Sequence, residues 1–230
     1  MAILPQIPQP GMDPLSVFGA TRDANGVLRW PDLDQMLRRA RSQNTGDRRW
    51  RGWKDAQAEE LVALAKQTSR LGLLDINLAG DFNALVYLST PVPRWPEAGQ
   101  LRIGDHAIVH LNYQSAWLTD PFPGWMPSGV MSPVDLYLPN AAPAARGALC
   151  LGAIAPGTPI TELTYLTYYA LSLQTATLDE TEGVLNPHAC EYYRDHPEFM
   201  PLTRTGLLDP WSPQELQGLD AILLTNGGRI

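Results

Sequence analysis

The chain has 230 residues, a formal net charge of −7 and 18% charged residues. This length suffices for one domain of about 150–180 residues with a sizeable core, together with an extension. The negative charge argues against a nucleic-acid-binding protein, because phosphate binding requires a basic face. No run of about 18 apolar residues predicts a membrane span, and the amino-terminal residues lack the pattern of a secretory signal.

The chain contains two cysteines and four histidines. Two cysteines in a chain of this length do not form a disulfide framework, so we expect a cytoplasmic protein with reduced thiols. The cysteines lack the spacing of a zinc site, and the histidines do not complete a ligand set with them. We therefore expect neither a metal nor a cofactor.

The first half of the chain predicts helices and then strands. Residues 1–50 are rich in Pro, Gly, Asp and Arg, and they are interpreted as an amino-terminal extension. Apolar residues on one side predict a helix that Gly72 ends, and alternating apolar residues predict strands. The predicted elements are helices over 31–42 and 53–71, a strand over 84–88, a turn over 91–96 and a strand over 106–113.

The second half begins with a proline-rich segment over 120–133, which predicts a rigid, non-helical crossing. Thr158 and Pro159 predict a helix start with a hydroxyl cap, and apolar residues at a spacing of about 3.6 continue that helix. Strands followed by helices indicate an α+β fold, in which helices flank one antiparallel sheet. The remaining predicted elements are a short strand or extended run over 134–138 and helices over 187–199 and from 212 to about 224.

Cys150 lies in a loop of small residues, between Leu149 and Leu151. A nucleophilic thiol must be partly exposed and able to ionise, whereas most cysteines are buried as small hydrophobic residues. The residues around Cys150 leave both interpretations open. Cys190 occupies an apolar position of the helix predicted over 187–199, and it is interpreted as a core residue.

Several short motifs follow one another in a recognisable order. They are Leu138-Pro139-Asn140, Gly147-Ala148-Leu149-Cys150-Leu151, Thr158-Pro159, the acidic run over 179–182 and Leu185-Asn186-Pro187. In this order the chain resembles the ubiquitin-conjugating enzymes over residues 53–199, in the manner of their divergent bacterial relatives. Leu138 stands where that family has a histidine, and the ten-residue step from Asn140 to Cys150 is longer than usual.

The resemblance implies a four-stranded antiparallel meander flanked by helices, within a catalytic domain over 51–230 that ends in a helix. It implies that Cys150 receives a ubiquitin-like modifier as a thioester from an activating enzyme and passes it to an amine, a lysine of a target protein. It also implies a bacterial conjugation operon linked to phage defence. Neither nucleic acid nor a membrane is expected as a partner.

The resemblance also suggests which residues assist Cys150. Asn140 would donate its amide to the oxyanion, although asparagine after proline is also typical of a turn. Glu182, or Glu180 and Asp179 beside it, would orient or deprotonate the lysine, although the run could equally be a solvated loop. His188 could activate the thiol or accept the proton of the amine, or it could be structural.

Two other functions remain compatible with the residues. The first is a non-catalytic adaptor of the same fold, which binds a ubiquitin-like protein without forming a thioester. The second is an unrelated cysteine hydrolase that uses Cys150 and His188 on amide or ester substrates.

Overall fold

The computed structural model describes residues 20–22, 28–95, 99–120, 126–142, 147–180 and 183–210. Its centre is a four-stranded antiparallel sheet in the order β3-β4-β5-β6, which is a meander because each strand pairs with the next one in the chain. This arrangement confirms the predicted α+β class. The strands are β3 (Leu71–Asn77), β4 (Phe82–Arg94), β5 (Arg102–Tyr113) and β6 (Ser128–Ser132), and a separate small pair consists of β1 (Thr21–Arg22) and β2 (Leu28–Arg29).

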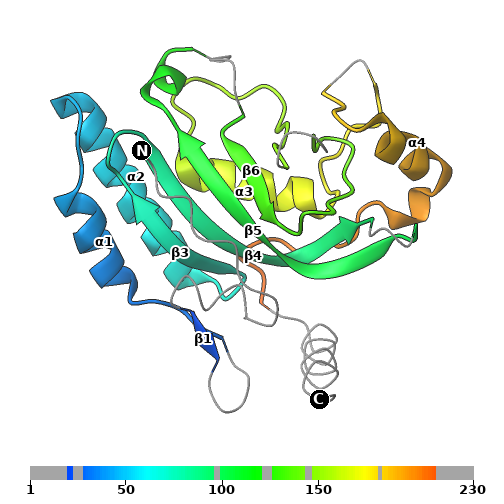
Figure 1. Ribbon diagram of the computed structural model, residues 1–230, viewed down its shortest axis with the longest axis horizontal. Helices are drawn as coiled ribbons and strands as arrows, with labels where there is room; N and C mark the ends of the chain where they lie inside the picture. Colours follow the sequence, from blue (N-terminus) through cyan, green and yellow to red (C-terminus); the bar gives the residue numbers. More distant parts are fainter. Residues whose placement is uncertain are drawn as a thin grey trace.

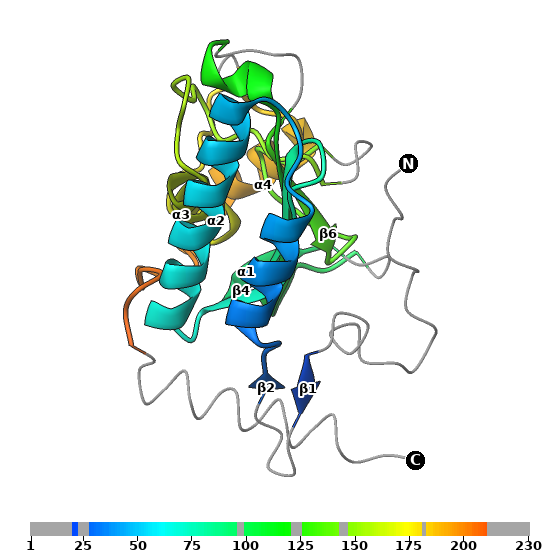
Figure 2. The ribbon, with the colours of Figure 1, turned by 90° about the vertical axis from the view of Figure 1, so that its left-hand side faces the viewer.

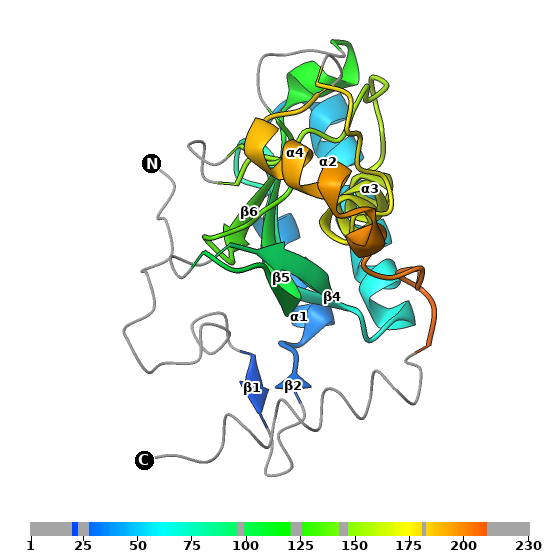
Figure 3. The same ribbon diagram turned by 90° about the vertical axis from the view of Figure 1, so that its right-hand side faces the viewer.

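Helices cover one face of this sheet. Helix α2 (Arg48–Gln67) and helix α3 (Ile160–Leu171) lie on the same side, as Figures 2 and 3 show, and both contact strands of the sheet. Helix α1 (Leu33–Ser42) packs beside α2 and β3 (Figure 1), whereas helix α4 (Pro187–Asp195) lies toward the opposite end of the sheet. Two short 3-10 helices complete the described elements, Ser115–Leu118 and Pro197–Phe199.

The main core lies between the sheet and these helices. Alternate residues of β4 are buried there, which are Phe82, Ala84, Val86 and Leu88. Met36, Leu37 and Ala40 of α1 belong to the same core. The boundary proposed at residue 50 falls inside α2, and the helix expected after residue 211 lies outside the described residues.

The opposite face of the sheet is partly covered by the segment before α1. Trp30 packs across Gly72 of β3, where a Cβ atom would come within 2.3 Å of the tryptophan ring. A second cluster of buried residues forms there around Leu74 and Ile108. Strand β3 is thus buried on both faces.

The helix predicted over 53–71 was wrong at both ends. Helix α2 begins at Arg48 because the carboxylate of Asp47 accepts a hydrogen bond from the Trp50 backbone N–H at 2.9 Å. It ends at Gln67, and Leu71 is already the first residue of β3. That strand was missed because a strand buried on both faces lacks apolar alternation and resembles a helical apolar run.

The turn predicted over 91–96 was also wrong, since β4 continues to Arg94. Pro91 lies within the register shift between Ser89 and Val92, where the strand needs no regular ladder. Pro93 lacks an N–H, but its carbonyl accepts a hydrogen bond from the Tyr137 backbone N–H at 2.9 Å. Prolines are therefore accommodated where this strand is irregular or needs only an acceptor.

In the proline-rich segment over 120–133, residues 121–125 lie outside the described residues; the described part, 126–133, is non-helical as predicted, but it contains a strand, β6. Of the short strand or extended run predicted over 134–138, residues 134–135 form a turn, and Leu136 makes an isolated bridge with Arg94. The helix predicted over 187–199 divides in two, because α4 ends at Asp195 and a 3-10 turn follows at Pro197. Within the described residues no helix combines the length and apolarity that crossing a bilayer would require.

Helix α3 begins near the predicted position, but its start is stabilised differently. The Thr158 hydroxyl does not cap the helix; it donates to the carbonyl of Ala155 at 2.7 Å. Instead, the first helical N–H, on Ile160, donates to Oε1 of Gln57 at 2.7 Å. Because Gln57 lies on α2, the two helices are joined at the point where α3 begins.

Candidate active site

Cys150 ends an extended arm that is held on both sides by backbone hydrogen bonds. On one side, Val130 donates to Gly147 at 2.9 Å and Leu149 donates to Ser128 at 3.0 Å, which fastens the arm to β6. On the other side, the backbone N–H of Cys150 donates to the carbonyl of Asn140 at 2.8 Å. The position of the thiol is therefore set by the sheet rather than by a free loop.

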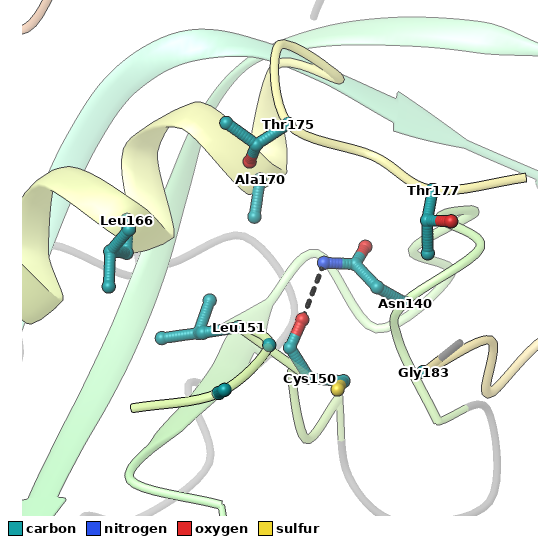
Figure 4. Close-up of a pocket in the computed structure, with 10 residues that line it drawn as sticks. Asn140, Cys150, Leu151, Leu166, Ala170, Thr175, Thr177 and Gly183 are labelled. Carbon is teal, nitrogen blue, oxygen red and sulfur yellow. Dashed lines mark hydrogen bonds between the residues drawn. The ribbon is translucent and has the colours of Figure 1, made fainter. Parts of the chain in front are cut away.

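Asn140 lies directly beside Cys150. Its side-chain nitrogen Nδ2 donates to the carbonyl oxygen of Cys150 at 2.9 Å, as the dashed line in Figure 4 shows. A carbonyl oxygen can only accept a hydrogen bond, so the nitrogen of the amide must face Cys150. The residue is only 5% exposed, and none of the described residues donates a hydrogen bond to its oxygen Oδ1.

A cleft of about 490 Å³ opens beside the thiol. Helix α3 forms one wall, and the segment that follows it forms another (Figure 4). Every lining side chain is uncharged, and most are small. The lining residues are Asn140, Cys150, Leu151, Gly152, Ala153, Leu166, Ala170, Thr175, Thr177 and Gly183.

Gly183 lies against the thiol. Its φ of +75° is in the left-handed region, and a Cβ atom at this position would be 3.1 Å from Sγ of Cys150. The chain just beyond it is anchored next to Asn140, because the backbone N–H groups of Leu185 and Asn186 donate to the carbonyl of Pro139 at 2.8 and 2.9 Å. Glycine therefore meets two requirements here, a positive φ and space for the sulfur.

The structure does not bring the two described acidic residues, Asp179 and Glu180, into this cleft. Glu182 lies outside the described residues. Asp179 and Glu180 are exposed, and Glu180 forms an ion pair with Arg194 of α4. Neither carboxylate lines the cleft, so the predicted role in orienting a lysine has no geometric support from these two residues.

His188 belongs to an aromatic cluster on α4 and not to the lining of the cleft. The hydroxyl of Tyr137 contacts Nδ1 of His188 at 2.6 Å, and the Trp95 ring meets the imidazole edge to face. Burial raises the pKa of Tyr137 to about 12, so this hydroxyl keeps its proton at neutral pH. The geometry thus gives His188 a structural partner and no contact with the thiol of Cys150.

Both cysteines are free thiols, but their surroundings differ. Cys150 is partly exposed, whereas Cys190 is fully buried, as expected for a core residue. The Cys190 thiol donates to the carbonyl of Leu178 at 3.1 Å and accepts a hydrogen bond from Arg194 at 3.3 Å. Of the described residues, no three His, Cys, Asp or Glu side chains are grouped closely enough to hold a metal ion.

The sequence did not indicate the part that Gly183, Thr175 and Thr177 play in the cleft. A glycine after an acidic run suggests a turn, but it carries no information about which side chain the turn will face. Threonines after a helix are equally ordinary. These residues reach Cys150 only because the segment after α3 folds back over the cysteine arm.

The site combines a partly exposed thiol, a buried amide and an uncharged cleft. Such a thiol can act as a nucleophile once ionised, but none of the described residues that line the cleft is a base that could activate a water molecule. Comparison of the chain with protein-family models, with curated proteins and with solved structures finds no match.

Proposed function

We propose that this chain is a ubiquitin-conjugating-like enzyme, which carries a ubiquitin-like modifier as a thioester on Cys150 and transfers it to an amine. Its partners would be an activating enzyme, the modifier and a target protein that offers a lysine. The observation that carries the proposal is a partly exposed thiol at a fixed position, next to a buried amide and in a cleft whose described lining side chains are uncharged.

The composition of the cleft favours an acyl carrier over a hydrolase. A cysteine hydrolase needs a base held close to the thiol and to the attacking water. His188 is the predicted candidate, but it contacts Tyr137 and does not line the cleft. The described lining residues include no such base, which favours a carrier, because a thioester survives longer where no group activates water.

The arrangement of the chain supports the same proposal. Helices α1 and α2 precede a four-stranded meander, and a cysteine arm, helix α3 and helix α4 follow it. This is the order that the resemblance implies. The ubiquitin-conjugating fold is the more specific architecture that we propose for this α+β arrangement.

The reaction requires two exchanges at one carbonyl carbon. In the first, the thiolate of Cys150 attacks the thioester of the activating enzyme, a new sulfur–carbon bond forms, and the bond to the sulfur of the activating enzyme breaks, so that this sulfur leaves as a thiolate. In the second, a neutral amine attacks the Cys150 thioester, the sulfur–carbon bond breaks, Cys150 leaves as a thiolate, and the amine proton passes to solvent. Cys150 regains its thiol state by taking up a proton from solvent, and the modifier is joined to its target through an amide bond.

The test is a charging reaction that contains an activating enzyme, a ubiquitin-like modifier, ATP and this protein. We expect an adduct that dithiothreitol removes, that is lost in Cys150→Ala and that persists in Cys190→Ala. Stable binding of the modifier without any adduct would instead support the adaptor. An adduct of unchanged intensity in Cys150→Ala would refute the carrier role of this cysteine.

A further inference from the structure

Two hydrogen-bond donors near the thiol of Cys150 are already engaged. Acyl transfer passes through an intermediate with a negatively charged oxygen, and this oxyanion needs donors close to the sulfur. The backbone N–H of Cys150 donates to the carbonyl of Asn140 at 2.8 Å. The side-chain nitrogen Nδ2 of Asn140 donates to the carbonyl of Cys150 at 2.9 Å, so one of its two hydrogens is directed at that oxygen.

The next donor along the chain is the backbone N–H of Leu151. None of the described residues accepts a hydrogen bond from it. Leu151 and Gly152 both line the cleft beside the thiol, and a Cβ atom at Gly152 would meet no atom within 4 Å. In another class of acyl-transfer enzyme, the N–H of the residue after the nucleophile serves the oxyanion. Leu151 holds the equivalent position next to open space.

Asn140 sets the direction of this N–H. The carbonyl of Cys150 and the N–H of Leu151 belong to one trans peptide unit, so they point in opposite directions. Because the carbonyl is bound by Asn140, the N–H of Leu151 faces away from the Asn140 side chain. In Figure 4 the carbonyl oxygen of Cys150 points toward Asn140, whereas the sulfur lies at the other end of the residue. The N–H and the thiol are therefore both directed away from Asn140.

We propose that the backbone N–H of Leu151 donates to the oxyanion formed at Cys150, and that Asn140 orients this N–H by holding the Cys150 carbonyl. The inference rests on the proposed function, and it makes Asn140 a positioning residue in place of the expected oxyanion donor. The thiolate of Cys150 attacks the thioester carbon, and the carbonyl oxygen becomes the oxyanion. When this oxygen returns to a carbonyl, the bond to the leaving sulfur breaks and that sulfur departs as a thiolate.

The experiment compares two reactions of the same thiol. S-phenyl thioacetate acetylates the Cys150 thiolate through an oxyanion and releases thiophenolate, whereas iodoacetamide alkylates it by displacing iodide without an oxyanion. Both rates are followed by intact mass, with the site assigned in Cys150→Ala. The ratio of acetylation to alkylation is independent of the fraction of ionised thiol. In wild type we expect this ratio to exceed that of glutathione by about 100-fold, the effect of one oxyanion donor.

The N–H is removed by incorporating the α-hydroxy acid analogue of leucine at position 151, which keeps the side chain and replaces the N–H by an ester oxygen. The same type of replacement at Ala155, an exposed position outside the cleft lining, is the matched control. We expect the ester at Leu151 to lower the ratio by about 100-fold, to that of glutathione. The ester at Ala155 should leave the ratio of wild type unchanged.

Asn140→Ala distinguishes positioning from direct donation. If Asn140 acts through the N–H of Leu151, the variant should lower the ratio, and adding the ester at Leu151 should lower it no further than the ester alone. Two independent donors would multiply their effects, and that result would overturn the positioning role. The ester at Leu151 still tests the donor if Asn140→Ala does not fold.

The outcomes separate this inference from the proposed function. A wild-type ratio no higher than that of glutathione would overturn the inference, because no oxyanion donor would then act at Cys150. An unchanged ratio in the folded Leu151 ester would overturn it as well. The proposed function has its own test in the charging reaction. A failure of wild type to charge, together with a high ratio that the Leu151 ester abolishes, would refute the proposed function and support the donor.

Discussion

The contact between Gln57 and the start of α3 offers a quantitative test of the fold around the site. Oε1 of Gln57 accepts the Ile160 backbone N–H at 2.7 Å, both residues are buried, and no side chain at the start of α3 caps it. Gln57→Met preserves the length of the side chain but removes the acceptor. The buried N–H is then left unpaired, which costs about 1–3 kcal/mol of unfolding free energy.

Urea unfolding followed by circular dichroism measures this cost. With a loss of about 2 kcal/mol and a denaturant slope of about 2 kcal/mol per molar urea, the midpoint should fall by about 1 M. Gln57→Glu is the matched control, because it keeps an oxygen that can accept at the positive end of the helix. We expect it to lose less stability than Gln57→Met.

Thr158→Val compares the predicted cap with the observed one. The Thr158 hydroxyl only donates to Ala155, so its loss should cost about 1 kcal/mol, the net worth of one hydrogen bond. A larger loss in Thr158→Val than in Gln57→Met would refute the assignment of the cap to Gln57. A midpoint for Gln57→Met within about 0.25 M of wild type, equivalent to about 0.5 kcal/mol, would do the same.

Three further predictions concern the two thiols, Gly183 beside Cys150, and His110 on strand β5. Iodoacetamide should label Cys150 in the native protein and Cys190 only after unfolding, because of the two thiols only that of Cys150 is partly exposed. Mass spectrometry of the labelled peptides identifies which cysteine reacts, and labelling of Cys190 in the native protein would contradict its burial. Gly183→Ala should cost about 1 kcal/mol more than Gly157→Ala, which has a similar φ of +79° but open space around it. The excess should vanish in a Cys150→Ala background, and an excess that persists there would show that the sulfur is not its cause. Burial lowers the pKa of His110, so folding favours the neutral imidazole. The stability that the neutral imidazole contributes is therefore present above about pH 6.5 and is lost as the pH falls through the lowered pKa. Urea midpoints at pH 7.5 and 5 should therefore fall less in His110→Gln than in wild type, and equal falls would contradict the shift.

The periodic parts of the fold could be predicted from the sequence, and the irregular parts could not. Strand β5 alternates between a buried and a more open face, so its core was visible in the pattern of residues. Strand β3 was not visible, because Trp30 and a second apolar cluster cover its outer side. The prolines of β4 were interpreted as a turn because a sequence does not show that the strand is irregular there.

The candidate site likewise contains features that could be predicted from the sequence and features that could not. The order of motifs was sufficient to place Asn140 next to Cys150, and the structure brings the two together. The direction of the Asn140 amide depends on a backbone carbonyl ten residues away, so it could not be predicted. The part played by His188 was also beyond prediction, since its partner Tyr137 is distant in the sequence and reaches it only in the folded chain.

The most direct test of the central claim is a charging reaction with Cys150→Ser beside wild type. The hydroxyl of serine can accept the acyl group, but it forms an ester that dithiothreitol does not cleave. We predict a dithiothreitol-sensitive modifier adduct in wild type, a resistant adduct in Cys150→Ser and none in Cys150→Ala. An adduct that stays dithiothreitol-sensitive in Cys150→Ser, or the absence of any adduct in wild type charged under conditions that load the activating enzyme, would contradict the account.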